Sequence, residues 1–324
     1  MKAVLCRQYG PPENLIVEET ESPKAVHGKL VIQVKACGVN FPDTLMIQGK
    51  YQVKPPFPFS PGGEVAGVVK EVGEGITHLK PGDRVFALSG FGGFAEETLA
   101  DGFKTFRLPD GMEYVTAASL MYTYGTSYHA LKDRANLQAG ETLLVLGAAG
   151  GVGLAAVELG RMMGANVIAA ASTAEKLALC RQVGARDTIN YSRDDLRERL
   201  KEMTGGRGVD VVYDPVGGSL TEAALRSVGW RGRYLVVGFA AGQIPAIPLN
   251  LPLLKGCSIV GVFWGAFAEK QPEDNFNNVQ ELLSFYDRGL IKPHIQAQYP
   301  IEKASQALRE MMDRQVLGKV VITP

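Results

Sequence analysis

The pattern of apolar and polar residues changes near residue 120 of the chain. Before that point, short apolar stretches alternate with turns rich in Gly and Pro, a pattern typical of an irregular β-rich domain. Residues 1–6 predict a first strand, and examples of the further predicted strands are residues 29–35, 64–72, 83–88 and 105–108.

From residue 142 onward, apolar runs that predict strands alternate with segments that predict helices. Most of the runs are continuously apolar, as a parallel sheet buried on both faces requires. Six such strands indicate an α/β fold with a Rossmann-type, doubly wound six-stranded parallel sheet that binds a nucleotide. The predicted strands are residues 142–146, 167–171, 187–190, 210–213, 233–239 and 258–263.

The C-terminal segment from residue 268 predicts a helix (277–287), a short strand (297–300), a second helix (301–314) and a last strand (319–322). We expect this segment to pack back on the β-rich domain and to leave a cleft beside the parallel sheet. The predicted domains are therefore residues 1–121 with 268–324, the catalytic domain, and residues 122–267, the nucleotide-binding domain.

The composition excludes several classes of function. The 324 residues carry 34 basic and 34 acidic side chains, so no broad attraction to nucleic acid or to an anionic membrane is expected. No apolar run approaches the roughly 20 residues that span a bilayer, and the N-terminus lacks the apolar core of a signal peptide. Four scattered cysteines without C-x-x-C spacing are typical of reduced thiols. These features predict a cytoplasmic protein.

The segment from Thr142 to Gly160 carries the strongest chemical signal, because a glycine turn links an apolar strand to a helix there. Gly147, Gly150 and Gly153 have the spacing at which a tight turn, the approach of a pyrophosphate and helix–strand packing each exclude a side chain. The N-terminus of the following helix offers N–H groups and a positive dipole end to phosphate. The pattern predicts a dinucleotide site.

The end of the second predicted strand indicates which nucleotide binds, because an acidic residue there would bind a ribose 2′-hydroxyl. That strand ends in Ala171, Ser172 and Thr173, without a carboxylate. Ser172, with Lys176 on the next helix and Tyr191 after the third strand, could donate to a 2′-phosphate, which favours NADPH over NADH. The alternative is that Lys176 is a solvated helix residue and that Tyr191 packs at a strand end.

Two segments of the first domain, residues 36–43 and 60–64, resemble the medium-chain dehydrogenase/reductase superfamily. Its alcohol dehydrogenases carry zinc ligands in these segments, in a Cys-Gly and a Gly-His-Glu motif. Here Gly63 stands in place of the histidine, and no cysteine lies between Cys37 and Cys180. A catalytic zinc needs three protein ligands, so no metal site is predicted, and Cys37 is expected to be a small buried apolar residue.

The whole chain resembles the zinc-free quinone oxidoreductase family of this superfamily. The stretches that carry the resemblance are residues 38–43, 81–85, 125–131, the glycine turn, 185–191, 204–206 and 212–217. The resemblance implies a GroES-like domain beside a Rossmann domain, bound NADPH and a homodimer.

The resemblance also implies which residues meet the cofactor. Ser172, Lys176 and Tyr191 would bind the 2′-phosphate, and Arg314 would reach the adenosine end unless it is an ordinary surface arginine. The remaining implied contacts are Ala149, Gly150, Gly151, Val152 and Gly153 to the pyrophosphate, and Asn40, Thr126, Val216, Gly238, Phe239, Phe263, Trp264 and Gly265 to the nicotinamide half.

The activity implied by the resemblance is hydride transfer from NADPH to a quinone, with activated alkenes as further substrates. This reaction needs a well-positioned acceptor, and water can supply the protons, so a dedicated acid is not required. Asn40 and Tyr51 are the candidate catalytic residues. Tyr51 also resembles the proton-donating tyrosine of enoyl thioester reductases. It is therefore an acceptor contact in a quinone reductase, the acid of a 2-enoyl-CoA or 2-enoyl-ACP reductase, or an aromatic ring that packs against the neighbouring residues 55–58.

One motif in the sequence points to a different family of dehydrogenases. Tyr128 and Lys132 spell the Y-x-x-x-K of short-chain dehydrogenases, but they precede the glycine turn, so the match is a coincidence. A non-catalytic NADPH-binding protein is the alternative from another class of function. Residues 256–263 predict an apolar edge strand, which indicates a two-fold dimer formed through that edge.

Overall fold

The computed structural model describes all residues from 1 to 324 and divides them into two compact units. Unit 1 comprises Met1–Tyr122 and Pro293–Pro324, and unit 2 comprises Thr123–Lys292. The chain thus returns to unit 1 at Pro293, later than the predicted residue 268, because the helices in between pack within unit 2. None of the helices has the length and apolar character needed to cross a membrane.

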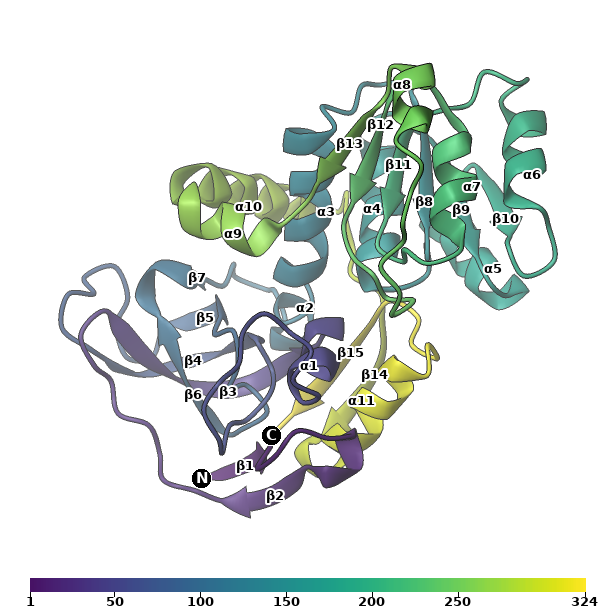
Figure 1. The fold of residues 1–324 in the computed structure, drawn as a ribbon. Coiled ribbons are helices and arrows are strands. Elements are labelled where there is room, and N and C mark those ends of the chain that lie inside the picture. The colour runs from purple at the N-terminus through teal and green to yellow at the C-terminus, as the bar shows by residue number, and fades with distance from the viewer. The chain divides into compact units, whose positions relative to one another are not determined.

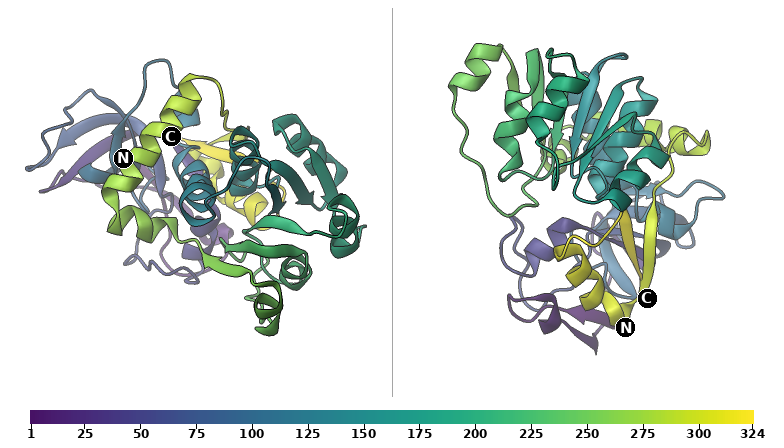
Figure 2. Two further views of the ribbon diagram at one scale, coloured as in Figure 1. Left: turned by 90° about the horizontal axis from the view of Figure 1, so that it is seen from above. Right: turned by 90° about the vertical axis from the view of Figure 1, so that its right-hand side faces the viewer.

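Unit 1 is the β-rich domain that the sequence predicted. Its strands and helices, in chain order, are β1 (Lys2–Leu5), β2 (Ile16–Glu19), β3 (Lys29–Val39), α1 (Phe41–Met46), β4 (Glu64–Val72), β5 (Arg84–Leu88), β6 (Glu97–Asp101), β7 (Thr105–Arg107), α2 (Tyr114–Ala117), β14 (Ile295–Pro300), α11 (Ala304–Met312) and β15 (Lys319–Thr323). Strands β2 and β6 lie outside the segments that the sequence analysis gave as examples of strands. The two ends of the chain lie close together in this unit (Figures 1 and 2).

The large sheet of unit 1 has the strand order β14-β15-β3-β4-β5-β7, with β6 also paired to β3. Strand β3 runs antiparallel to β15, where Val39 pairs with Val320, and to β4, where Gly38 pairs with Glu64. Apolar side chains of these strands and of α11 form the core of the unit. The pairing therefore brings the end of β3, the start of β4 and the start of β15 together.

Unit 2 alternates strands and helices. They are α3 (Thr126–Tyr128), β8 (Thr142–Leu146), α4 (Gly151–Met162), β9 (Asn166–Ala171), α5 (Ala174–Val183), β10 (Asp187–Asn190), α6 (Leu196–Met203), β11 (Val209–Asp214), α7 (Leu220–Arg226), β12 (Val228–Val236), α8 (Asn250–Lys255), β13 (Ser258–Gly261), α9 (Trp264–Lys270) and α10 (Pro272–Asp287). Helix α3 continues on both sides as π-helical turns.

The six strands of unit 2 form one parallel sheet in the order β10-β9-β8-β11-β12-β13. This is the doubly wound arrangement that the sequence predicted. Helices α4 and α5 pack together on one face, and α6 and α7 pack together on the other, as right-handed crossovers require (Figure 1). Strand β13 lies at the edge of the sheet.

Two strands end earlier than predicted. Strand β12 ends at Val236 rather than residue 239, because the backbone then turns and the N–H groups of Val237 and Gly238 donate to the Asp214 carbonyl oxygen. Strand β13 ends at Gly261 rather than residue 263, because α9, a helix that the sequence did not predict, begins at Trp264.

Candidate functional site

The carboxyl ends of the six parallel strands lie along one edge of the sheet in unit 2. Apart from Thr126, which begins α3, the predicted cofactor-binding residues of this unit follow these ends. The glycine turn follows β8, Ser172 and Lys176 follow β9, Tyr191 follows β10, Val216 follows β11, Gly238 and Phe239 follow β12, and Phe263, Trp264 and Gly265 follow β13. Doubly wound sheets bind nucleotides at this edge, so the fold gathers this part of the predicted site.

Of the three glycines that define the motif, the fold requires Gly147 and Gly153 but not Gly150. Gly147 has a φ of 57°, in the left-handed region. A Cβ at Gly153 would lie 2.3 Å from the Gly147 carbonyl oxygen and 2.9 Å from the Ala148 Cα. A Cβ at Gly150 would find its nearest neighbour, the same carbonyl oxygen, at an ordinary 3.5 Å. Packing within the protein therefore does not explain Gly150, and the predicted approach of a pyrophosphate to this residue stays a prediction.

A side chain of α3 holds the start of α4 in place. The Ser127 hydroxyl donates to the Val152 carbonyl oxygen over 2.8 Å and lies 2.9 Å from the Tyr213 hydroxyl of β11. Gly150 is the N-cap and provides no capping side chain. The first N–H groups of a helix have no acceptor within the helix, so this end of α4 fits a pyrophosphate group.

The residues predicted to bind a 2′-phosphate meet at the ends of β9 and β10. Strand pairing places Asn190 beside Ala171, and the Tyr191 N–H donates to the Ala171 carbonyl oxygen over 3.2 Å. The N–H of Lys176 donates to the Thr173 hydroxyl oxygen, which caps α5. Ser172, Lys176 and Tyr191 are each partly exposed. The backbone thus presents one serine, one lysine and one tyrosine at neighbouring strand ends.

Asp214 is a residue of the site edge that the sequence reasoning missed. One carboxylate oxygen accepts hydrogen bonds from the N–H groups of Val216 (2.8 Å) and Gly217 (2.9 Å). The other accepts from the hydroxyls of Tyr234 and Thr221. Asp214 therefore fixes the turn that carries Val216. The signal in the sequence is the Tyr-Asp-Pro-Val-Gly motif of residues 213–217, one of the stretches that carry the family resemblance.

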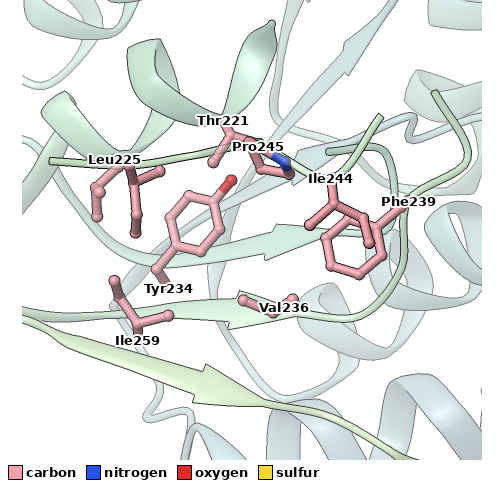
Figure 3. Close-up of a pocket in the computed structure, with 9 residues that line it drawn as sticks. Thr221, Leu225, Tyr234, Val236, Phe239, Ile244, Pro245 and Ile259 are labelled. Atoms are coloured by element: carbon pink, nitrogen blue, oxygen red, sulfur yellow. The ribbon is translucent and has the colours of Figure 1, made fainter. Parts of the chain in front are cut away.

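An apolar pocket of about 130 Å³ opens between α7, β12, β13 and the loop after β12 (Figure 3). The residues that line it are Thr221, Leu225, Tyr234, Val236, Phe239, Ile244, Pro245, Ile247 and Ile259. Its two hydroxyl groups already bond to Asp214. Of the predicted cofactor-binding residues, only Phe239 contributes, and its ring lies beside Ile244. The pocket is therefore distinct from the glycine turn.

The segment after β13 divides into an exposed and a buried part. Phe263 is 60% exposed, whereas Trp264 is buried. The Trp264 indole N–H donates to the Asn275 side-chain oxygen over 3.1 Å, and a Cβ at Gly125 would lie 2.7 Å from its ring. Trp264 therefore packs α9 against the helical segment that contains α3, and its contact with the nicotinamide half stays a prediction.

In unit 1, the end of β3 carries a buried polar network around Asn40. The Lys319 ammonium donates to the Asn40 Oδ1 (2.7 Å), the Glu64 Oε2 (3.0 Å) and the Val39 carbonyl oxygen (3.1 Å). The Asn40 Nδ2 donates to the same Glu64 oxygen (2.9 Å) and to the Gly38 carbonyl oxygen (3.2 Å). The sequence analysis predicted Asn40 but assigned no role to Glu64 or Lys319.

A second carboxylate, Asp43, lies next to this network. Its two oxygens accept hydrogen bonds from the N–H groups of Asn40 (2.8 Å) and Gly62 (3.1 Å). Complete burial raises the pKa of Asp43 to about 6 in spite of these hydrogen bonds. Burial, followed by the nearby Asp43 charge, also raises the pKa of Tyr51 and that of Tyr122. Tyr51 is thus within electrostatic reach of the Asn40 region, and Tyr122 is a further phenol that sequence reasoning missed.

The position of Gly63 does not accommodate a side chain. A Cβ there would lie 2.7 Å from the Gly90 carbonyl oxygen and 2.8 Å from the Tyr122 hydroxyl oxygen. The nearby Cys37 is fully buried, as predicted, and its sulfur would lie 2.7 Å from a Cβ at Gly62. No three His, Cys, Asp or Glu side chains lie close enough together to hold a metal ion.

Arg314 lies in unit 1, just after the end of α11. Its φ is 59°, so a non-glycine residue occupies the left-handed conformation that usually follows a helix C-terminus as glycine. This conformation costs a residue with a Cβ about 1–2 kcal/mol. An arginine at this position therefore destabilises the fold relative to a glycine. Its contact with the adenosine end of the cofactor stays a prediction.

Tyr128 and Lys132 have a structural partner in α10. The Tyr128 hydroxyl donates to the Glu281 carboxylate, and the Lys132 ammonium donates to the same oxygen over 2.6 Å. The ammonium also lies 5.1 Å from the centre of the Tyr128 ring. These contacts join α10 to the α3 segment, which explains why the chain returns to unit 1 only after α10.

Comparison with known proteins adds to this geometry. Residues 26–110 match the family described as alcohol dehydrogenase GroES-like domain, and residues 151–285 match the family described as zinc-binding dehydrogenase. The quinone oxidoreductase-like protein 2 homolog of Nematostella vectensis is 41% identical, over 99% of this chain and 88% of that protein. Quinone oxidoreductase-like protein 2 of Rattus norvegicus is 39% identical, over 99% and 92%.

Solved structures are similar over the full length. The crystal structure of Escherichia coli quinone oxidoreductase complexed with NADPH has a TM-score of 0.95 and 31% sequence identity, and the similarity covers 100% of both chains.

Proposed function

Because this chain belongs to the quinone oxidoreductase family of the medium-chain dehydrogenases/reductases, we propose that it is an NADPH-dependent reductase that passes a hydride to quinones without a metal ion. The relatives and the solved structures confirm the family that the sequence motifs predicted. Activated alkenes are proposed as further acceptors.

The observation that carries this proposal is the glycine turn followed by the ends of β9 and β10, neither of which is an acidic residue. The packing of the protein does not require a glycine at position 150. The missing side chain leaves room for a ligand at the start of α4. Ser172, Lys176 and Tyr191 then offer donors where an acidic residue would otherwise bind a 2′-hydroxyl. Donors without a facing carboxylate favour a 2′-phosphate, which distinguishes NADPH from NADH. The NADPH complex of the Escherichia coli relative supports the same cofactor.

When bound, NADPH would supply the hydride. The residues of this chain would then hold the two partners in place. The N–H groups of residues 150–153 and the donors at β9 and β10 would bind the phosphates, and Asn40 would border the nicotinamide half. Burial raises the pKa of Tyr51, so its phenol stays protonated near neutral pH and is a weak acid. This favours Tyr51 as a hydrogen-bond donor to a quinone oxygen, with water as the source of protons.

The region that holds zinc ligands in alcohol dehydrogenases supports a reaction without a metal. Gly63 stands where those enzymes have a histidine, and neighbouring atoms fill the space that a side chain would need there. Cys37 lies buried beside glycines. Neither position offers a ligand set with an open coordination site, which a catalytic zinc requires.

The test is a steady-state assay of NADPH oxidation with an ortho-quinone and with a 2-enoyl-CoA, each with wild type and Tyr51→Phe. We expect the protein to turn over the quinone. The rate should fall by no more than about tenfold in Tyr51→Phe, because the substitution removes one hydrogen bond between neutral groups. Turnover of the thioester alone, abolished in the variant, would favour an enoyl thioester reductase. NADPH binding with no oxidation by any acceptor would favour a non-catalytic binding protein.

We also propose that two copies associate through β13. This strand is the sheet edge. Ile259 within the strand is 38% exposed, and Phe263 just after it is 60% exposed. An exposed apolar edge is a template for pairing with a second copy, which would continue the sheet. A monomeric mass by light scattering at micromolar concentration would contradict this. The cytoplasm is the proposed compartment, because all four cysteines are free thiols.

A further inference from the structure

Lys319 is a charged residue in the interior of unit 1 that the proposed mechanism does not use. Its side chain is 4% exposed, and that of its partner Glu64 is 1% exposed. Strand β15 begins at Lys319 and pairs with β3, and β4 begins at Glu64 and pairs with β3 on the other side. The register therefore places both charges at the end of β3, on either side of Asn40.

The partners of Asn40 determine which way its amide group faces. An ammonium group only donates hydrogen bonds, so the Asn40 atom 2.7 Å from Lys319 must be the carbonyl oxygen. The amide nitrogen then faces two acceptors, the Glu64 carboxylate and the Gly38 carbonyl oxygen. With these three contacts, both N–H donors and one lone pair of the amide are used. Asn40 is left with one acceptor and no donor.

This arrangement limits what Asn40 can do for a ligand. A free asparagine offers either its oxygen or its N–H groups, because the amide can turn over. Here the turned amide would place N–H groups against the ammonium and an oxygen against two oxygens. The Lys319 charge thus selects one of two orientations. Glu64 in turn needs Lys319, because a buried carboxylate without a cationic partner strongly destabilises a fold.

We infer that Lys319 is a positioning residue that holds Asn40 as a hydrogen-bond acceptor toward the nicotinamide half of the cofactor. This inference rests on the proposed function, which places Asn40 at that half. Lys319 itself touches neither cofactor nor substrate in this account. It acts through the amide group of Asn40.

The first test measures the orientation in the wild-type protein, without any turnover. In ¹⁵N-labelled protein, the two Asn40 side-chain amide protons are assigned by their loss in Asn40→Leu. We expect both to exchange with solvent at least 100-fold more slowly than those of the exposed Asn136. Exchange at a similar rate would show that the N–H groups face outward and would overturn the inference. This readout stands even if the protein reduces no quinone.

The second test follows the single-turnover rate of NADPH oxidation by an ortho-quinone. The variant Lys319→Met with Glu64→Gln removes both buried charges together, which avoids an uncompensated carboxylate. We expect its rate to fall at least tenfold, as in Asn40→Leu. Adding Asn40→Leu to the double variant should then lower the rate by less than twofold, because Lys319 acts through Asn40. Losses that multiply, or a wild-type rate in the double variant, would overturn the inference.

A matched control removes another ion pair by the same substitutions. Arg233 and Glu141 form two 2.7 Å contacts in unit 2, so Arg233→Met with Glu141→Gln should lower thermal stability but leave the oxidation rate within twofold. If the Lys319 double variant does not fold, the exchange measurement decides. If none of the acceptors supports NADPH oxidation by wild type, the proposed function fails. The exchange measurement still decides the orientation of the Asn40 amide.

Discussion

Substitution of Gly150 or Gly153, at the start of α4, should distinguish an effect on stability from an effect on cofactor binding, because packing requires only Gly153. We compare Gly153→Ala with Gly150→Ala, which add the same methyl group three residues apart. At Gly153 the methyl would lie 2.3 Å from the Gly147 carbonyl oxygen, a distance that only a backbone shift can relieve. At Gly150 the nearest atom would lie at 3.5 Å, an ordinary contact.

The magnitudes follow from these distances. Overpacking costs about 1–3 kcal/mol, and a 2.3 Å contact with a backbone oxygen belongs to the upper part of that range, about 2–3 kcal/mol. The higher helix propensity of alanine offsets about 1 kcal/mol at Gly153. Gly153→Ala should therefore be less stable by about 1–2 kcal/mol, whereas Gly150→Ala should differ from wild type by less than about 1 kcal/mol. A methyl group that blocks one N–H contact to the pyrophosphate should cost about 1.5–3 kcal/mol of binding, or about 10- to 100-fold in Kd.

The assays are thermal unfolding without ligand and titration of NADPH fluorescence. The account requires Gly150→Ala to keep the thermal midpoint of wild type and to lose most of its NADPH affinity. Wild-type affinity in Gly150→Ala would refute the idea that a ligand explains this glycine. Wild-type stability in Gly153→Ala would refute the reading of the close contact with Gly147.

Three further predictions test other parts of the site. Lys176→Ala should raise the Kd for NADPH about tenfold or more and leave that for NADH unchanged in fluorescence titrations, because a charge-assisted hydrogen bond to the 2′-phosphate is lost. Arg314→Gly should stabilise the protein against heat by about 1 kcal/mol, since φ is 59°, yet weaken NADPH binding; unchanged binding would make Arg314 an ordinary surface residue. The pKa of Asp43 rises from 3.8 to about 6 on folding, so its protonated form is favoured in the folded state, and its contribution to stability is full below pH 3.8 and lost as the pH rises through 6. The free energy of unfolding of wild type relative to Asp43→Asn, from urea titrations, should therefore decrease by about 2 kcal/mol between pH 4 and pH 7, and a constant difference would contradict the raised pKa.

The parts of the site that are written in neighbouring residues were predictable from the sequence. The glycine turn, the strands β8 and β10 and the polar residues that follow them obey local rules of backbone conformation and apolar patterning. Strand β12 ends earlier than predicted because of Asp214, which belongs to the neighbouring strand β11. Its carbonyl oxygen accepts hydrogen bonds from the two N–H groups that follow β12. Helix α9 was missed because Phe263 to Gly265 continue the apolar run of β13 in sequence.

The Asn40 network could not be predicted, because its members meet only through pairing between distant strands. Lys319 opens an apolar C-terminal strand and resembles a surface lysine there. Its burial follows from the register of β15 on β3, and the position of Glu64 follows from the register of β4. Neither pair of strands is joined by a short hairpin turn that would fix its register in the local sequence. The contact of Trp264 with Asn275 was likewise hidden, because it depends on how α9 and α10 pack.

The central claim is that this chain oxidises NADPH with a quinone and needs no metal ion to do so. The most direct measurement is the rate of NADPH oxidation with an ortho-quinone, before and after treatment with a chelator, in protein whose metal content is known from elemental analysis. The account predicts the same rate in both samples, with far less than one metal ion per chain. A rate that follows the zinc content, or no oxidation of NADPH by any quinone, would contradict it.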